Sequence, residues 1–375
     1  MRQRLKNFWQ RVSEGLEIRV LWAQFFSEAK ESYSLYDREV DWDALKGDSR
    51  FRRFRKTCNA LFWAMLLKLS PARRVFLLIA LALGILSLTN TTSDVNGIQV
   101  RSPQVSPLFP IGMLVFLLAL ELADRVIMKR DLEIAREIQR WLVPETPPSV
   151  PGLDLAFSSK PANTVGGDYY DAFPLDAEQP PGENNPVMLV VADVAGKSVP
   201  AALLMATFHA SLRSVAPVTT SLTETVTRMN RYCCAHSLEG RRYTTAFFAE
   251  YNPATRVLTY VRAGHNEPYL LRASGQFERL NAGGLPLGIN SNEPYLSTEI
   301  TLATGDLLLI YSDGLIEAVN EREEEFGEQR VIDLMKNSPR ETAEQTLRRM
   351  LSSVRAFTGQ RRQYDDMTAL VVRAT

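Results

Sequence analysis

Four aspartates of this 375-residue chain share one setting, because each lies at the end of an apolar run or in a tight turn beside one. They are Asp168, Asp193, Asp313 and Asp365, with Asp366 as an adjacent alternative to the last. One such aspartate alone is typical of a turn or a helix cap. Four carboxylates that strands bring together repel one another unless they are protonated or bridged by cations. Oxygen ligands favour Mg²⁺ or Mn²⁺ over zinc, and no Cys or His cluster competes.

The clearest of these settings is the stretch Pro186–Ala206. Val187–Ala192 is an apolar run typical of a strand covered on both faces, and it ends at Asp193. A turn follows, and capping and helix-forming residues then predict a helix from about Ser198 onward. Gly-Lys-Ser at 196–198 also suggests a phosphate-binding loop, but that motif requires a glycine where this chain has Val191. The sequence therefore disfavours a nucleotide loop.

The elements that position these acids are expected from Leu153 onward, where the pattern is one of many short strands and few helices. Strands are predicted at residues 153–158, 187–192, 244–251, 257–263, 268–271, 277–280, 296–302, 307–311 and 368–372. Helices are predicted at residues 199–215, 222–236, 328–336 and 340–357. Turn residues between consecutive strands predict hairpins, and therefore antiparallel sheets.

Six motifs follow one another along this region: VGGDYYD, ADVAGKS, AGHNEPYLLR, GGLPLGI, GDLLLIYSDGLIEA with a following FGEQR, and DDMTALVV. The stretch EIAREIQRWLVPETPP precedes them. Together they strongly resemble the SpoIIE/RsbU-like branch of the PPM (protein phosphatase 2C) family, over about residues 132–372. The resemblance implies an α+β fold, an αββα sandwich of two antiparallel sheets flanked by helices. It also implies a metal-dependent serine/threonine protein phosphatase.

Family members hydrolyse phosphoserine and phosphothreonine with two Mn²⁺ or Mg²⁺ ions and an activated water. By this resemblance Asp193 would bridge the ions and the Val194 carbonyl would join one of them. Asp313 and Asp365 would hold the other ion, and Asp168 would bind directly or through water. The substrate implied is a phosphorylated anti-sigma-factor antagonist or a similar signalling protein.

Other positions carry weaker expectations. Gly167, with Gly166, would permit the tight turn that aims Asp168. The branch often shows Ser-Gly-Lys-Gly where this chain has Ala-Gly-Lys-Ser at 195–198. The arginine with which eukaryotic relatives hold phosphate has no evident counterpart, so Lys197 is a possible phosphate contact, with a solvated turn lysine as the alternative. His265 is interpreted as a turn histidine rather than an acid–base catalyst.

The N-terminal third lies outside this resemblance, and residues 1–70 are predicted to be a basic helical cytoplasmic region. In it, Met1–Phe26 has the pattern of an amphipathic helix that either lies on an anionic membrane or packs on its neighbours. The three cysteines have neither disulfide nor metal-site spacing, which suits a reducing compartment. The formal charge is zero, which offers no support for nucleic-acid binding.

Two uncharged blocks, Val75–Leu88 and Leu108–Leu120, predict a transmembrane hairpin within residues 71–122. Cationic residues flank the pair on its outer sides, at Lys68, Arg73, Arg74, Arg125, Lys129 and Arg130. The positive-inside rule then places both termini and the phosphatase domain in the cytoplasm. The family resemblance implies that the membrane is a bacterial inner membrane. The alternative is a buried helical hairpin in a soluble domain.

Residues 123–150 are predicted to form a linker helix before a phosphatase domain at 151–375. One stripe has coiled-coil spacing with a single polar position, at Met128, Leu132, Ala135, Gln139 and Leu142. A second stripe contains Ile134, Ile138 and Trp141. We expect the first stripe to pair with a twin helix in a homodimer and the second to pack on the phosphatase domain. A plain helical spacer is the alternative.

The sequence therefore predicts a membrane-anchored protein phosphatase. A catalytically inactive docking or sensor protein is a second hypothesis, although every expected aspartate is present. An ATPase built on Gly196-Lys197-Ser198 is the third.

Overall fold

The computed structural model describes residues 63, 66, 67, 69–95, 98–103, 105–176, 182, 185–237, 242–338 and 341–375. The chain divides into two compact units, Met1–Val126 and Ile127–Thr375, which are described separately. The predicted helix Met1–Phe26, and with it nearly all of residues 1–70, lies outside the described residues.

In the unit Ile127–Thr375, one sheet has the strand order β10-β7-β6-β5-β4, and β11 also pairs with β7. Its pairings are antiparallel except for that of β10 with β7. The bounds are β4 Tyr169–Pro174, β5 Val187–Val194, β6 Thr244–Asn252, β7 Val257–Ala263, β10 Gly283–Gly284 and β11 Thr298–Thr301. In the middle of this sheet, β5 is buried along nearly its whole length, as its apolar run predicts.

The second sheet has the order β3-β13-β12-β8-β9 and is antiparallel throughout. Its strands are β3 Leu153–Lys160, β8 Tyr269–Leu271, β9 Phe277–Arg279, β12 Leu307–Tyr311 and β13 Met367–Ala374. The C-terminal strand β13 lies between β3 and β12, so the last strand of the chain is paired on both sides.

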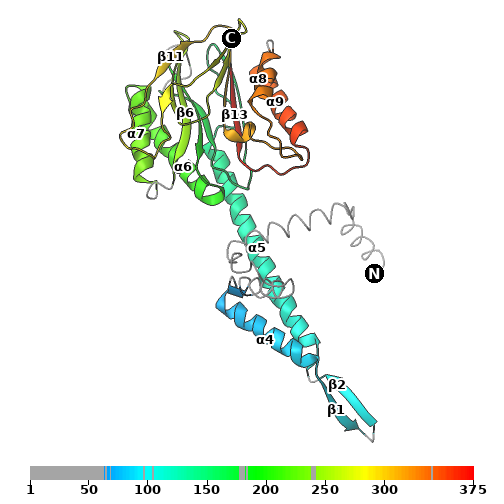
Figure 1. Cartoon of the computed structure of the whole chain (residues 1–375). Coiled ribbons are helices and arrows are strands. Elements are labelled where there is room, and N and C mark those ends of the chain that lie inside the picture. Colours follow the sequence, from blue (N-terminus) through cyan, green and yellow to red (C-terminus); the bar gives the residue numbers. More distant parts are fainter. Residues whose placement is uncertain are drawn as a thin grey trace, which may run out of the picture. The chain divides into compact units, whose positions relative to one another are not determined.

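Helices cover the outer face of each sheet. They are α6 Ser198–Val215, followed by the short helix η2 Ala216–Val218, then α7 Leu222–Ala235, α8 Glu328–Lys336 and α9 Ala343–Thr358. Figure 1 shows α6 and α7 on one side of the two sheets and α8 and α9 on the other. Three apolar clusters fill the layers, one between the sheets and one between each sheet and its helices. The predicted αββα sandwich is therefore confirmed.

In the unit Met1–Val126, helix α4 (Pro71–Ser87) is followed by a β-hairpin of β1 (Asn90–Val95) and β2 (Ile98–Pro103). Helix α5 (Leu108–Leu142) begins in this unit and ends in the other. Its first turns pack on α4, since the rings of Phe76 and Phe116 lie 5.9 Å apart. Arg73 pairs with both Glu121 at 3.0 Å and Asp124 at 2.6 Å.

Within the described residues, one helical stretch is long and apolar enough to cross a membrane, Ser198–Val218, with a mean hydropathy of 1.2. It comprises α6 and η2, and its buried residues belong to the sandwich core, so it is a core helix. Helix α4 has 17 residues, and the first turns of α5 already include Glu121 and Asp124. The transmembrane hairpin is not confirmed and stays a prediction.

Candidate metal centre

The predicted acids lie at one end of the sandwich. In an antiparallel pair the start of one strand lies beside the end of its neighbour, so residues that precede one strand and follow the other come together. In the first sheet, Tyr169 at the start of β4 is paired with Ala192 near the end of β5, so Asp168 and Asp193 lie beside each other. In the second sheet, Tyr311 at the end of β12 is paired with Ala369 near the start of β13. Asp313 therefore follows one strand where Asp365 and Asp366 precede the other. Each sheet contributes one such pair of strands.

Hydrogen bonds between the sheets hold these ends together. The buried Ser312 hydroxyl donates to Asp168 Oδ2 at 2.8 Å and accepts from the Thr368 backbone N–H at 2.9 Å. The Asp366 carboxylate accepts from the backbone N–H groups of Gly167 at 2.6 Å and Ala162 at 2.8 Å. Asp366 thus fixes the turn that precedes Asp168, whereas Asp365 points to a different partner.

Gly167 is required by a close approach of backbone to backbone. A Cβ at this position would lie 2.8 Å from the Val194 carbonyl oxygen, closer than such atoms pack. The same Cβ would lie 3.7 Å from Asp193 Oδ1. The Val194 carbonyl and the Asp193 carboxylate are therefore both beside the Gly167 turn, and the structure brings these three predicted residues together.

The carboxylates raise one another's pKa. The pKa of Asp193 is raised to about 7, first by burial and then by the charges of Asp313 and Asp365. The pKa of the buried Asp168 is raised well above its ordinary range by burial and by Asp193. Burial and Asp365 also raise the pKa of Asp313. Without a cation, this cluster cannot be fully ionised at neutral pH without a large electrostatic cost.

This donor set suits a hard divalent cation, because it consists of carboxylates and one backbone carbonyl. The carboxylates, when ionised, need a positive charge beside them. Mg²⁺ and Mn²⁺ prefer such oxygen ligands. In the part of the chain that the structure describes, no three His, Cys, Asp or Glu side chains form a ready-made group around one ion. The residues fit a divalent cation, while the number and the kind of ions stay predictions.

The side chain of Lys197 is 56% exposed and forms an ion pair at the edge of the cluster, and its contact with phosphate stays a prediction. Its Nζ lies 2.9 Å from Asp365 Oδ2 and donates to the Tyr364 carbonyl at 2.8 Å, so its ammonium supplies one positive charge at the edge of the cluster. This ion pair does not favour the ATPase hypothesis. His265 is 3% exposed, with Nδ1 2.9 Å from Thr245 Oγ1, and burial lowers its pKa to about 4. Its ring is therefore neutral at neutral pH.

The last helical turns of α5 contact the Gly166–Gly167 loop that precedes Asp168. The sequence did not predict this contact. Gln139 Nε2 donates to the Gly166 carbonyl at 2.7 Å, and the Gly166 N–H donates back to Gln139 Oε1 at 3.2 Å. The polar position in the heptad stripe therefore binds the loop that carries Asp168. The one signal in the sequence was that Gln139 is a polar residue in an otherwise apolar stripe.

The predicted orientation of the two stripes of the linker helix is wrong. Leu132 lines a cavity together with residues 162–165, and Gln139 binds Gly166, so the first stripe faces the sandwich from Leu132 onward, whereas Met128 is exposed. In the second stripe, Ile134, Ile138 and Trp141 are 47%, 49% and 79% exposed. Spacing alone identified both stripes but could not assign their partners, because both are apolar.

The sequence profile of the family described as Stage II sporulation protein E (SpoIIE) matches residues 183–375, slightly more than half of the chain. The chain belongs to the SpoIIE family. The predicted resemblance to the SpoIIE/RsbU-like branch of the PPM phosphatases is thus confirmed.

Curated relatives agree with this assignment to the SpoIIE family. The phosphoserine phosphatase RsbU of Bacillus subtilis is 32% identical over 52% of this chain and 56% of its own length. The phosphoserine phosphatase RsbP of the same organism is 25% identical over 50% of this chain and 46% of its own length. The chain spans about half the length of the curated relatives it matches.

Solved structures support the fold. The PP2C domain of SiaA from Pseudomonas aeruginosa covers 68% of this chain and 99% of that domain, with a TM-score of 0.58 and 19% identity. The RsbU and RsbW domains of a Mycobacterium tuberculosis protein cover 62% of this chain and 63% of theirs, with a TM-score of 0.51 and 24% identity. At these identities the likeness shows the PP2C fold alone.

Proposed function

We propose that the chain is a protein phosphatase that hydrolyses phosphoserine and phosphothreonine with two bound Mn²⁺ or Mg²⁺ ions. The observation that carries the proposal is the convergence of the strand-end acids, whose raised pKa values call for a cation. The names of its relatives RsbU and RsbP support the phosphoserine specificity. Asp193, the Val194 carbonyl, Asp313, Asp365 and Asp168 would hold the ions, which when bound supply Lewis acidity toward the phosphoryl group and the attacking water.

We infer direct attack by water rather than a phosphorylated enzyme. Ser312, whose hydroxyl contacts Asp168, is fully buried. It already donates to Asp168 and accepts from Thr368, so it orients a carboxylate and is not free to act as a nucleophile. Gln139 and Asp366 brace the Gly166–Gly167 turn that aims Asp168.

The test is release of inorganic phosphate from a phosphoserine protein by the full-length chain in detergent. We expect release that requires Mn²⁺ or Mg²⁺ and that is abolished in Asp193→Asn and in Asp313→Asn, since each substitution removes a proposed ligand. Circular dichroism should show that both variants stay folded. Hydrolysis that survives exhaustive EDTA treatment would reject the mechanism, and failure of the wild type on every phosphoprotein would favour an inactive docking or sensor protein.

The substrate that we infer is a phosphorylated cytoplasmic signalling protein of the anti-sigma-factor antagonist type, from the resemblance to RsbU-like phosphatases. We also infer that α4 and the first turns of α5 anchor the chain in a bacterial inner membrane, with both termini in the cytoplasm. The exposed apolar side chains of these helices support an anchor, since Ile85, Leu108 and Phe109 are 68%, 76% and 70% exposed. A buried helical hairpin in a soluble domain would cover them.

A homodimer through the linker helix is the remaining part of the proposal. Because the stripe with Leu132 and Gln139 faces the sandwich, the stripe available to a second copy is that of Ile134, Ile138 and Trp141. An exposed apolar stripe along one helix face matches a twin helix presenting the same residues.

A further inference from the structure

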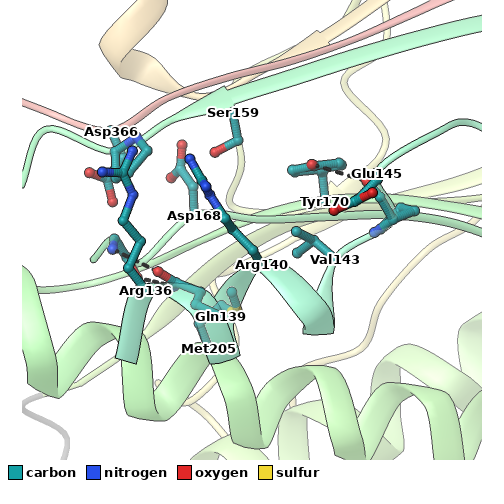
Figure 2. A pocket seen from close by; sticks show the side chains of 13 residues that line it. Arg136, Gln139, Arg140, Val143, Glu145, Ser159, Asp168, Tyr170, Met205 and Asp366 are labelled. Atoms are coloured by element: carbon teal, nitrogen blue, oxygen red, sulfur yellow. Dashed lines mark hydrogen bonds between the residues drawn. The ribbon is translucent and has the colours of Figure 1, made fainter. Parts of the chain in front are cut away.

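A cavity of about 300 Å³ lies between the end of α5 and the acid cluster. Two arginines from α5, Arg136 and Arg140, line it one helical turn apart, and Asp168 and Asp366 line the wall across from them. Figure 2 shows both arginine side chains rising from α5 into the space beside these two aspartates. The volume is at the lower end of the range of roughly 300–1,000 Å³ for small-ligand pockets.

Neither arginine has a hydrogen bond or an ion pair with any residue that the structure describes. Three carboxylates line the cavity: Asp366 accepts two backbone N–H groups, Asp168 accepts from Ser312, and Glu145 lies beside Tyr170 (Figure 2). Like charges at positions i and i+4 of a helix repel each other, and an anion bound between Arg136 and Arg140 would relieve that repulsion. Gln139 lies between them in sequence, and its bonds to Gly166 hold this face of α5 against the site.

We propose that Arg136 and Arg140 bind the phosphoryl group of the substrate, and the phosphate that hydrolysis releases, within this cavity. The proposal rests on the proposed phosphatase function, because a phosphoryl dianion can approach Asp168 and Asp366 only when cations neutralise the acid cluster. The guanidinium fork bonds two phosphate oxygens at once, which a lysine cannot do. The linker helix thus contributes binding residues to the site in addition to bracing it.

The experiment compares the full-length chain in detergent and Mg²⁺ with Arg136→Gln, Arg140→Gln and the double variant. Arg130→Gln is the matched control, since Arg130 is an exposed arginine of the same helix outside the cavity. Calorimetry measures the dissociation constant for inorganic phosphate, and kinetics measures KM and kcat on a phosphoserine peptide. We expect both the dissociation constant and KM to rise about tenfold for each single variant, the range of a lost charge-assisted hydrogen bond, and further for the double variant. Arg130→Gln should leave both unchanged.

Arg136→Lys and Arg140→Lys separate charge from geometry and should recover part of the phosphate affinity. Phosphate affinity within twofold of wild type in the double variant, or an equal loss in Arg130→Gln, would overturn the proposal while leaving the phosphatase assignment intact. Wild-type protein that binds phosphate through these arginines but releases none from phosphoserine would instead reject the proposed function.

Discussion

At the scale of single residues, the carboxylates of the acid cluster repel one another, and a bound cation would relieve this repulsion. Asp193 is a candidate ligand because other carboxylates lie beside it. Burial and these neighbouring charges raise its pKa from 3.8 to about 7. A cation competes with protons for such a carboxylate, so cation affinity and the protonation of Asp193 must be linked.

This linkage has a sign that can be measured on the EDTA-treated chain. A carboxyl whose pKa is raised by folding stabilises the folded state below its ordinary pKa and loses that contribution as the pH rises through its folded pKa. The stability contributed by Asp193 should therefore fall between pH 3.8 and about 7. Asp193→Asn should remove this part of the loss and therefore be more stable than wild type at about pH 8. We expect a difference on the order of 2 kcal/mol, less than the full pKa shift would give, because partial exposure lets solvent screen the charge.

Urea unfolding of the two proteins at about pH 5 and about pH 8 gives the comparison. His265 contributes an opposite slope, because its pKa is lowered, but it does so in both proteins and cancels in the difference. Equal pH dependence in wild type and Asp193→Asn would show that this carboxyl titrates normally.

At the scale of elements, α5 has two apolar stripes with different partners. Its last turns contact the Gly166 loop through Gln139, whereas Ile134, Ile138 and Trp141 face outward. We expect Ile138→Glu to weaken the proposed homodimer, because it places a charge where apolar side chains would be buried. Analytical ultracentrifugation of the full-length chain in detergent measures the effect.

The matched control is Glu137→Gln, an exposed change on the neighbouring position of the same helix, which should leave association unchanged. Leu132→Glu should act differently from Ile138→Glu: it disturbs packing on the sandwich and should lower phosphatase activity. A wild-type chain that stays monomeric at high concentration would refute the dimer.

At the scale of the whole molecule, the proposed anchor predicts a topology. A reporter fused at Asn96, between β1 and β2 in sequence, should be exposed outside the cytoplasm, whereas one fused at Thr375 should be inside. The physical reason is that the cations on the outer sides of the hairpin resist translocation. Recovery of the full-length chain in the soluble fraction without detergent would contradict this topology and favour a hairpin covered by protein.

The residue patterns alone predicted antiparallel strands with acids at their ends, and the family resemblance implied the sandwich. Buried strands such as β5 and β12 are apolar along their length, so the point where a charge first appears marks the strand end, and strand ends carry the site. The order of motifs was sufficient to identify the family. These properties are local, which is why they can be recognised in a single sequence.

Only the tertiary structure decided which groups complete the site. Strand β4 escaped prediction because Asp171 interrupts its apolar pattern, and the Arg213 that pairs with Asp171 lies 42 residues away. The bonds of Asp366 to Gly167 and of Gln139 to Gly166 likewise span long sequence distances. The residues around a polar side chain in the sequence do not reveal which distant group it will bind. The folded chain is therefore needed to show which face of α5 contacts the site and which cavity its arginines line.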